Sequence, residues 1–158
     1  MKKILLTKGK YALVDELDYE WLSQWKWLFG GRRYAARNTH FRDKDGNRHT
    51  QVIWMHREIL KTPKDLFTDH INGNGLDNRK SNLRIATKQQ NAWNLKRPRN
   101  NTSGFKGVYW RSNRWEAAIH KDNKKRHLGR FKELKQAITA YNNEAQKLFG
   151  KYAKLNII

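Results

Sequence analysis

The C-terminal third of the chain carries the pattern that most restricts its fold. Three runs alternate between apolar and polar residues as β-strands do, and short polar turns separate them; they are residues 106–111, 114–121 and 125–131. From residue 132 to 148, apolar residues then recur at spacings of three and four, the period of a helix with one apolar face. Gly150 follows as a stop signal. The pattern predicts a small three-stranded antiparallel sheet whose apolar face packs on one helix and whose other face is basic and exposed.

A short segment without apolar side chains precedes this pattern. Residues 96–104 read Lys-Arg-Pro-Arg-Asn-Asn-Thr-Ser-Gly, and such a polar stretch with a proline and a glycine is typical of a linker. We therefore expect two domains, residues 1–95 and 105–158, joined by residues 96–104.

The charge indicates a polyanionic partner. The chain holds 34 Lys and Arg against 14 Asp and Glu, a net charge of +20, and such self-repulsion is offset by binding an opposite charge. From Lys96 onward there are 16 basic and 4 acidic residues, so the shorter part is the more basic. Nucleic acid, a membrane surface and an acidic protein all fit this charge. The 7 Trp, 6 Tyr and 6 Phe argue against disorder.

Several classes of protein are disfavoured by what the sequence does not contain. No apolar run approaches the length of a membrane span, and the apolar run after Met1 is too short for a signal peptide. There is no cysteine, which excludes disulfides and cysteine-ligated zinc. We expect a cytoplasmic protein with no membrane partner.

The first 54 residues predict a mixture of short elements. Expected strands are 11–14, 34–37 and 52–55, and expected turns are Gly30-Gly31 and Asp45-Gly46-Asn47. Asp18 is placed to cap a short helix that runs through Trp25. Four tryptophans lie here, and we interpret them as core residues rather than as platforms for bases, because a small domain needs large anchors.

The segment from 68 to 91 concentrates polar chemistry. It reads as a short strand ending in Asp69-His70, a long polar turn, a second strand at 83–86, and a helix that Thr87 caps and that contains Asn91. A hairpin folded against that helix would bring Asp69, His70 and Asn91 together. Each of these features on its own is weak evidence for catalysis. A neighbouring Asp and His more often have a structural role than a catalytic one, and a turn rich in Asn and Gly usually has no catalytic role.

Together these residues suit metal-assisted hydrolysis of a phosphodiester. Mg²⁺ prefers oxygen ligands and keeps waters and substrate oxygens in its shell, so the Asp69 carboxylate and the Asn91 amide oxygen suffice as protein ligands. An amide in place of an imidazole at position 91 favours Mg²⁺ or Mn²⁺ over softer metals. His70 is a suitable general base, since the ordinary pKa of histidine lies near working pH.

This segment closely resembles the HNH (His-Asn-His) nuclease family. The resemblance rests on Asp69-His70, Asp77-Asn78-Arg79, Asn82-Leu83-Arg84, Thr87 four residues before Asn91, and the preceding His56-Arg57. It implies a ββα-metal core over 55–95 with an extension at 1–54. In that core His70 activates water, Asp69 and Asn91 hold the metal, and Asn82 pins the loop. Arg79 and Arg84 either clamp the scissile phosphate or serve as surface charges and bond loop carbonyls; the sequence favours neither.

The C-terminal part resembles the ethylene-response-factor type of DNA-binding domain. The resemblance is carried by Phe105-Lys106-Gly107-Val108, Trp115-Glu116-Ala117-Ala118-Ile119, Leu128-Gly129-Arg130-Phe131 and Ala140-Tyr141-Asn142. It implies DNA contacts at sheet positions Lys106, Tyr109, Arg111, Arg114, His120 and His127. The alternation of the third strand adds Lys125, on the same face as His127. Several of these are Arg or Trp in the plant domains, so the plant target sequence is not expected here.

The sequence thus predicts an α+β protein: a ββα-metal nuclease with a mixed α/β N-terminal extension, followed by a three-stranded sheet packed on one helix. The expected function is that of a site-directed, homing-type DNA endonuclease of phage origin. We expect it to bind double-stranded DNA as a monomer and to nick one strand. The alternatives are a DNA-binding regulator with an inactive nuclease fold and a nonspecific nuclease.

Overall fold

The computed structural model describes residues 1–30, 33–95 and 101–157 and has the α+β architecture that the sequence predicts. The chain divides into two compact units, Met1–Asn91 and Ala92–Ile158. The expected turn residue Gly31 and residues 96–100 of the expected linker lie outside the described residues. None of the described helices is long and apolar enough to span a membrane.

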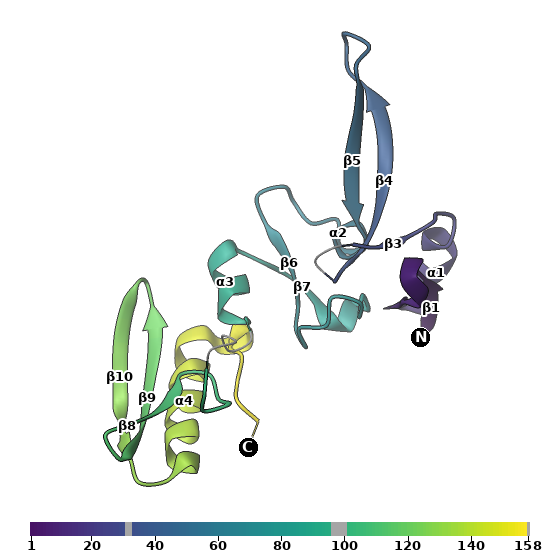
Figure 1. The fold of residues 1–158 in the computed structure, drawn as a ribbon. Helices are drawn as coiled ribbons and strands as arrows, with labels where there is room; N and C mark the ends of the chain where they lie inside the picture. The colour runs from purple at the N-terminus through teal and green to yellow at the C-terminus, as the bar shows by residue number, and fades with distance from the viewer. Residues whose placement is uncertain (31–32, 96–100, 158) are drawn as a thin grey trace. The chain divides into compact units, whose positions relative to one another are not determined.

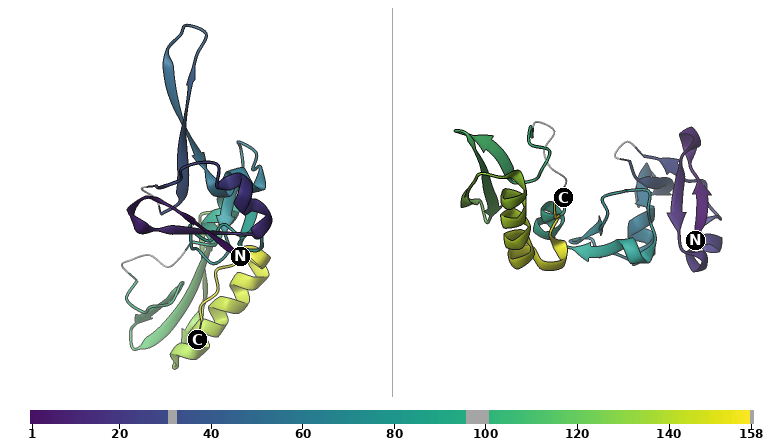
Figure 2. Two further views of the ribbon diagram at one scale, coloured as in Figure 1. Left: turned by 90° about the vertical axis from the view of Figure 1, so that its right-hand side faces the viewer. Right: turned by 90° about the horizontal axis from the view of Figure 1, so that it is seen from below.

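The N-terminal unit contains three small antiparallel sheets, β1-β2, β3-β4-β5 and β6-β7 (Figure 1). Its elements are β1 (Lys2–Leu5), η1 (Thr7–Gly9), β2 (Tyr11–Val14), α1 (Glu16–Leu22), β3 (Leu28–Phe29), β4 (Ala35–Arg42), β5 (Arg48–Trp54), α2 (Met55–Leu60), β6 (Phe67–His70), η2 (Lys80–Asn82), β7 (Leu83–Ala86) and α3 (Lys88–Trp93). β4 and β5 form a long ribbon that projects from the rest of the unit (Figures 1 and 2). The boundary between the two units falls inside α3.

The core of this unit is built from alternating apolar residues of the extension and from the nuclease segment. Its buried side chains are Ile4, Leu6, Ala12, Val14, Leu22, Trp27, Ala35, Met55, Ile59 and Leu83. Trp27 is 2% exposed, and its indole N–H donates to the Leu22 carbonyl at 2.8 Å. Trp25, by contrast, is 37% exposed and lies against the Arg37 guanidinium, 4.4 Å from the ring centroid. The expectation that the tryptophans fill the core therefore holds for Trp27 and is wrong for Trp25.

Asp18 does not cap a helix, contrary to the sequence prediction. α1 begins at Glu16, after Asp15, and ends at Leu22. Asp18 lies inside the helix, where its buried carboxylate pairs with Lys80 Nζ at 2.8 Å and accepts a hydrogen bond from the Trp21 indole at 3.2 Å. The ion pair with a residue 62 positions away could not be seen in the local pattern.

Two further boundaries differ from the prediction in the ribbon region. The expected strands at 34–37 and 52–55 are the inner ends of longer strands, β4 and β5, which pair as far as Arg42 and Arg48. Met55 starts α2 instead of ending a strand. The polar outer half of the ribbon lacks the alternation by which strands are recognised, since neither of its faces is buried.

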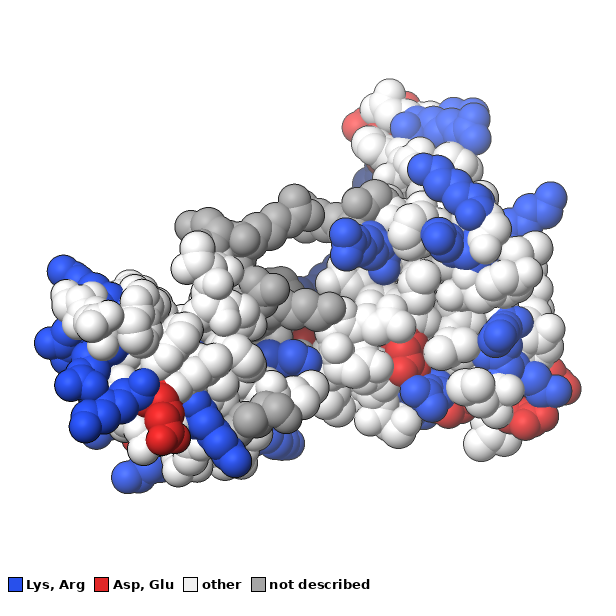
Figure 3. Space-filling view, turned by 60° about the horizontal axis from the view of Figure 1, so that its bottom comes forward, with Lys and Arg blue, Asp and Glu red and all other residues white. Residues whose placement is uncertain are grey.

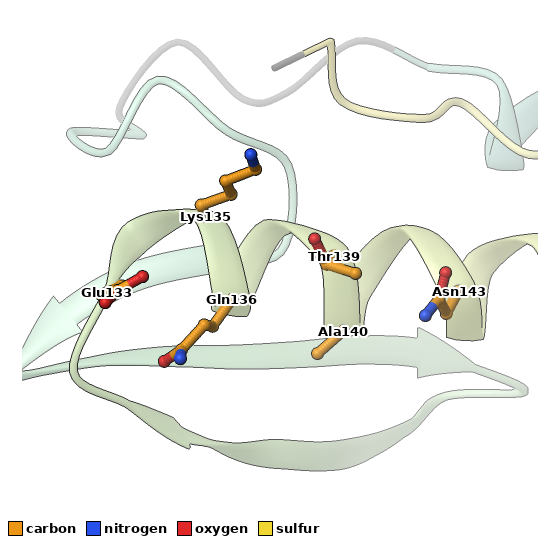
Figure 4. A pocket seen from close by; sticks show the side chains of 6 residues that line it. All are labelled: Glu133, Lys135, Gln136, Thr139, Ala140 and Asn143. Carbon is orange, nitrogen blue, oxygen red and sulfur yellow. The ribbon is translucent and has the colours of Figure 1, made fainter.

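The C-terminal unit confirms the predicted sheet and helix. β8 (Val108–Arg111), β9 (Arg114–Lys121) and β10 (Lys124–Phe131) form an antiparallel sheet in the order β10-β9-β8. α4 (Leu134–Phe149) lies along one face of it and is followed by η3 (Gly150–Tyr152) (Figure 2). The buried core joins both layers: Val108, Ala117, Ile119, Ala137, Ile138, Tyr141, Ala145 and Phe149. A shallow hollow on α4 is lined by residues that belong to no predicted site: Glu133, Lys135, Gln136, Thr139, Ala140 and Asn143 (Figure 4).

Candidate active site

The ladder between β6 and β7 places the Asp-His pair. Asp69 lies opposite Arg84, and His70 lies opposite Leu83. Asp69 and His70 are each 5% exposed. Buried polar side chains need partners, because an unpaired charge in the interior is costly. The surroundings of these two residues therefore define what the site can do.

Asn82 closes the polar loop between the two strands. Its side-chain oxygen accepts a hydrogen bond from the Asn72 backbone N–H at 3.0 Å, and its amide group donates to the Asp77 carbonyl at 2.8 Å. Its own carbonyl accepts from the Ile71 N–H at 2.9 Å. One side chain thus ties the start of the loop to its end.

The N-terminal extension supports the same loop, a role that the sequence did not reveal. Leu13 of β2 donates its N–H to the Leu76 carbonyl and accepts from the Asn78 N–H, both at 2.8 Å. The Asp15 carboxylate accepts from the Lys80 N–H at 2.8 Å. β2 and the start of α1 therefore hold the loop backbone on both sides of Asn78.

The Asn78 side chain fixes the orientation of His70. Asn78 is fully buried, and its amide oxygen lies 3.2 Å from His70 Nε2. Because that oxygen can only accept, Nε2 carries the proton and the lone pair is on Nδ1. Burial lowers the pKa of His70, although the Asn78 hydrogen bond and the nearby Asp69 and Asp77 carboxylates oppose the shift. The ring is therefore neutral at neutral pH, as a general base must be.

Aromatic rings complete the surroundings of His70. Tyr34 stacks on it at 5.5 Å between centroids, and the His56 ring meets it edge-on at 5.1 Å. Gly75 of the loop lies against Tyr34, where an added Cβ would overlap the ring and stand 2.6 Å from the Arg33 carbonyl oxygen. The sequence gives no local signal for these contacts, since Tyr34 and His56 come from other elements.

The two arginines of the motif are both engaged in ion pairs. Arg84 contacts Asp69 Oδ2 through Nε at 2.7 Å and through a terminal nitrogen at 2.6 Å. Arg79 donates two parallel hydrogen bonds of 2.7 Å to the Asp77 carboxylate. This contact is the main reason why the pKa of Asp77 is lowered. Their predicted contact with the scissile phosphate stays a prediction; the structure shows that each one orients a carboxylate.

α3 starts as predicted. The Thr87 hydroxyl accepts from the Gln90 N–H at 3.2 Å, and the Gln90 side chain accepts from the Thr87 N–H at 2.8 Å, a reciprocal capping box. Asn91 follows in the first turn, with its N–H donating to the Thr87 carbonyl at 3.0 Å. The carboxylate of Asp69 and the side-chain amide of Asn91 both offer oxygen atoms, the donors that a hard divalent cation prefers. That Asn91 is a ligand stays a prediction.

His56 is a buried histidine whose charge state is linked to folding. It is 7% exposed, and burial, together with His70 and Arg57, lowers its pKa to about 3. The unfolded chain binds a proton at this residue near the ordinary value of 6.5. His56 therefore contributes stability that is fully present above pH 6.5 and is lost as the pH falls towards 3.

Replacing His56 by asparagine should flatten the pH dependence of stability. We expect the free energy of unfolding of the N-terminal unit to fall by up to about 1.4 kcal/mol per pH unit below 6.5 from this residue, and the variant to lack that slope. Hydrogen exchange of β4 and β6 amides at pH 7 and pH 5 measures how the free energy of unfolding changes between the two pH values. Identical slopes in variant and parent would contradict the assignment.

The predicted DNA-contacting residues divide between two places. The ladder register puts Tyr109, Arg111, Arg114, His120, Lys125 and His127 on the sheet face opposite α4. Lys and Arg side chains gather over the strands of this unit (Figure 3). Lys106 lies elsewhere: its ammonium donates to the Trp93 and Leu95 carbonyls at 2.7 and 2.8 Å, and burial lowers its pKa to about 8. It caps the end of α3 and is not on the basic face.

Comparisons with known proteins agree with the geometry. Residues 61–93 match the family model described as HNH endonuclease. Over 158 aligned residues, covering 96% of this chain and 77% of the relative, the chain is 32% identical to the uncharacterised HNH endonuclease L560 of Acanthamoeba polyphaga mimivirus. It is 35% identical to protein 3.8 of Escherichia phage T7 over 94 residues, 58% of this chain and 77% of the relative. No solved structure matches the chain.

The match to L560 extends over nearly the whole chain, and the family model covers the segment that holds β6, the polar loop, β7 and α3. The chain therefore belongs to the HNH endonuclease family of phosphodiester hydrolases.

Proposed function

We propose that the chain is a site-directed DNA endonuclease that cuts one strand of its target, with residues 1–95 as nuclease domain, 96–104 as linker and 105–158 as DNA-binding domain. The observation that carries the proposal is the buried Asp69-His70 pair at the end of β6, with the His70 ring held by Asn78. Intact chemistry at these positions favours an enzyme over a regulator with an inactive fold.

The chain's own residues would divide the reaction between them. His70 accepts the proton of the attacking water at Nδ1, while Asn78 keeps the ring in the required tautomer. Asp69 and Asn91 would hold Mg²⁺ or Mn²⁺, and Arg84 fixes the Asp69 carboxylate through Oδ2. The cation supplies positive charge that stabilises the charge developing on the phosphate and the leaving oxygen.

The C-terminal unit would select the site. A sheet with one face on a helix and the other lined by Arg, Lys and His presents positive charge to phosphates, and strands can enter the major groove. The resemblance to the ethylene-response-factor domain supports this role. A dedicated binding module also favours a site-directed, homing-type enzyme over a nonspecific nuclease.

The metal assignment is tested by titrating Mg²⁺ in a cleavage assay with the variants Asp69→Asn and Asn91→Ala. Asp69→Asn loses the negative charge at the cation, and Asn91→Ala loses an oxygen donor. Each should raise the Mg²⁺ concentration needed for half-maximal rate by roughly 10-fold or more. Asp45→Asn, which removes the same charge from the exposed turn of the β4-β5 ribbon, is the control and should titrate like the parent. Superimposable curves for all variants would remove Asp69 and Asn91 from the metal site.

A further inference from the structure

A bulge in β10 changes which side chains face outward on the C-terminal sheet. His127 pairs with Ala118, but the next partner, Ala117, pairs with Gly129, so Leu128 is an extra residue. Gly129 has a φ of +136°, which a side chain would disfavour. Simple alternation from His127 would turn Arg130 towards α4. The bulge instead places Arg130 opposite Glu116, on the outer face.

Arg130 is anchored across this face at two points. Its Nε lies 3.2 Å from Glu116 Oε1, and a terminal nitrogen donates to the Ser112 carbonyl in the β8-β9 turn at 3.3 Å. Glu116 is 8% exposed, and His127 lies 3.9 Å from its other oxygen. The Arg130 side chain remains 48% exposed, and a guanidinium has five N–H donors, so this one is held in place with donors still facing solvent.

A buried carboxylate in the middle of a phosphate-binding face is electrostatically unfavourable. Glu116 repels the same polyanion that the surrounding lysines and arginines attract. Glu116 favours binding if it holds an arginine side chain in one orientation, because a preorganised guanidinium loses less conformational freedom on binding. The planar fork of arginine matches the O6 and N7 acceptors of guanine in the major groove.

We propose that Arg130, held by Glu116, is a specificity-determining residue that reads a guanine in the target DNA. The inference rests on the proposed role of the outer sheet face in DNA binding. Arg126 provides an internal contrast on the same strand. It pairs with Glu144 of α4 at 2.6 Å on the opposite side of the sheet, so it carries the same charge without facing the DNA surface.

The test is a selection of bound sequences from a random double-stranded DNA library, with the full chain in EDTA so that no cleavage occurs. The parent should select a motif that contains a preferred guanine. In Arg130→Ala, the preference for that guanine over other bases should fall by about 10-fold or more. Arg130→Lys keeps the positive charge but lacks the planar guanidinium, so it should lose the preference for that guanine. Glu116→Gln should also lose the preference for that guanine. This variant should bind random DNA at least as tightly as the parent, because a negative charge that repels DNA has been removed. Arg126→Ala should keep the preference for that guanine.

The outcomes separate the inference from the function on which it rests. If Arg130→Ala weakens binding to all sequences equally and the selected motif is unchanged, Arg130 contacts only phosphate and the inference is overturned. If the parent selects no motif at all, site-directed binding fails, and the inference fails with it. Melting curves that match the parent establish that each variant is folded.

Discussion

Replacing His70 by alanine should lower the rate of DNA cleavage by about 10²- to 10⁴-fold, while affinity for DNA stays within roughly a factor of two, because a general base acts only in the chemical step. His70 is the residue that the side chains of Asn78, Tyr34 and His56 all contact. A single-turnover cleavage assay and a binding assay in EDTA measure the two quantities separately.

His40→Ala is the matched control for this variant. His40 lies on the β4-β5 ribbon of the same unit, is exposed, and contacts Thr50; its loss should leave the cleavage rate near that of the parent. His70→Gln, which fills more of the buried site, guards against a loss that comes from unfolding. Near-normal turnover by either His70 variant would end the assignment of this residue as the base.

Gly107→Ala should destabilise the C-terminal unit and weaken selective DNA binding. Gly107 has a φ of +71°, and an added Cβ would overlap the ring of the buried Tyr141. Strain and overpacking together should cost roughly 3 kcal/mol or more. We expect a lower melting temperature for this unit and weaker, less selective binding, with cleavage of nonspecific DNA retained because the site lies in the other unit.

Gly104→Ala separates backbone strain from the clash. Gly104 has a φ of +83° but meets nothing within 4 Å of an added Cβ, so its variant should lose only about 1 kcal/mol. Equal melting temperatures for the two variants would contradict the packing of Gly107 against Tyr141.

The parts of the fold that the sequence predicted well are those in which local pattern and burial agree. β9 alternates because one face packs on α4, and α4 has a helical period because one stripe meets the sheet. The bulge at Leu128 was not predicted. One extra residue reverses the face to which the following side chains point, without interrupting the strand-like run in the sequence. Arg130 was therefore missed as an outward-facing residue.

The candidate site was predictable where a motif names its residues. Asp69, His70 and Asn82 lie within one segment, and the motif names them as candidates directly. The Asn78–His70 contact depends on how the loop folds back, and the support from Leu13, Asp15 and Tyr34 comes from residues 36 or more positions away. Such contacts are set by tertiary packing, which a single sequence does not display.

Whether one Asp69-His70 site cuts one strand is tested most directly with a supercoiled plasmid that carries the selected target. With Mg²⁺ or Mn²⁺, the plasmid should convert first to the open circle, at a rate proportional to enzyme concentration, with linear DNA formed late. EDTA should stop the conversion. Linear DNA formed as fast as nicked DNA, at a rate rising with the square of enzyme concentration, would show that two copies act together and would contradict a nicking monomer.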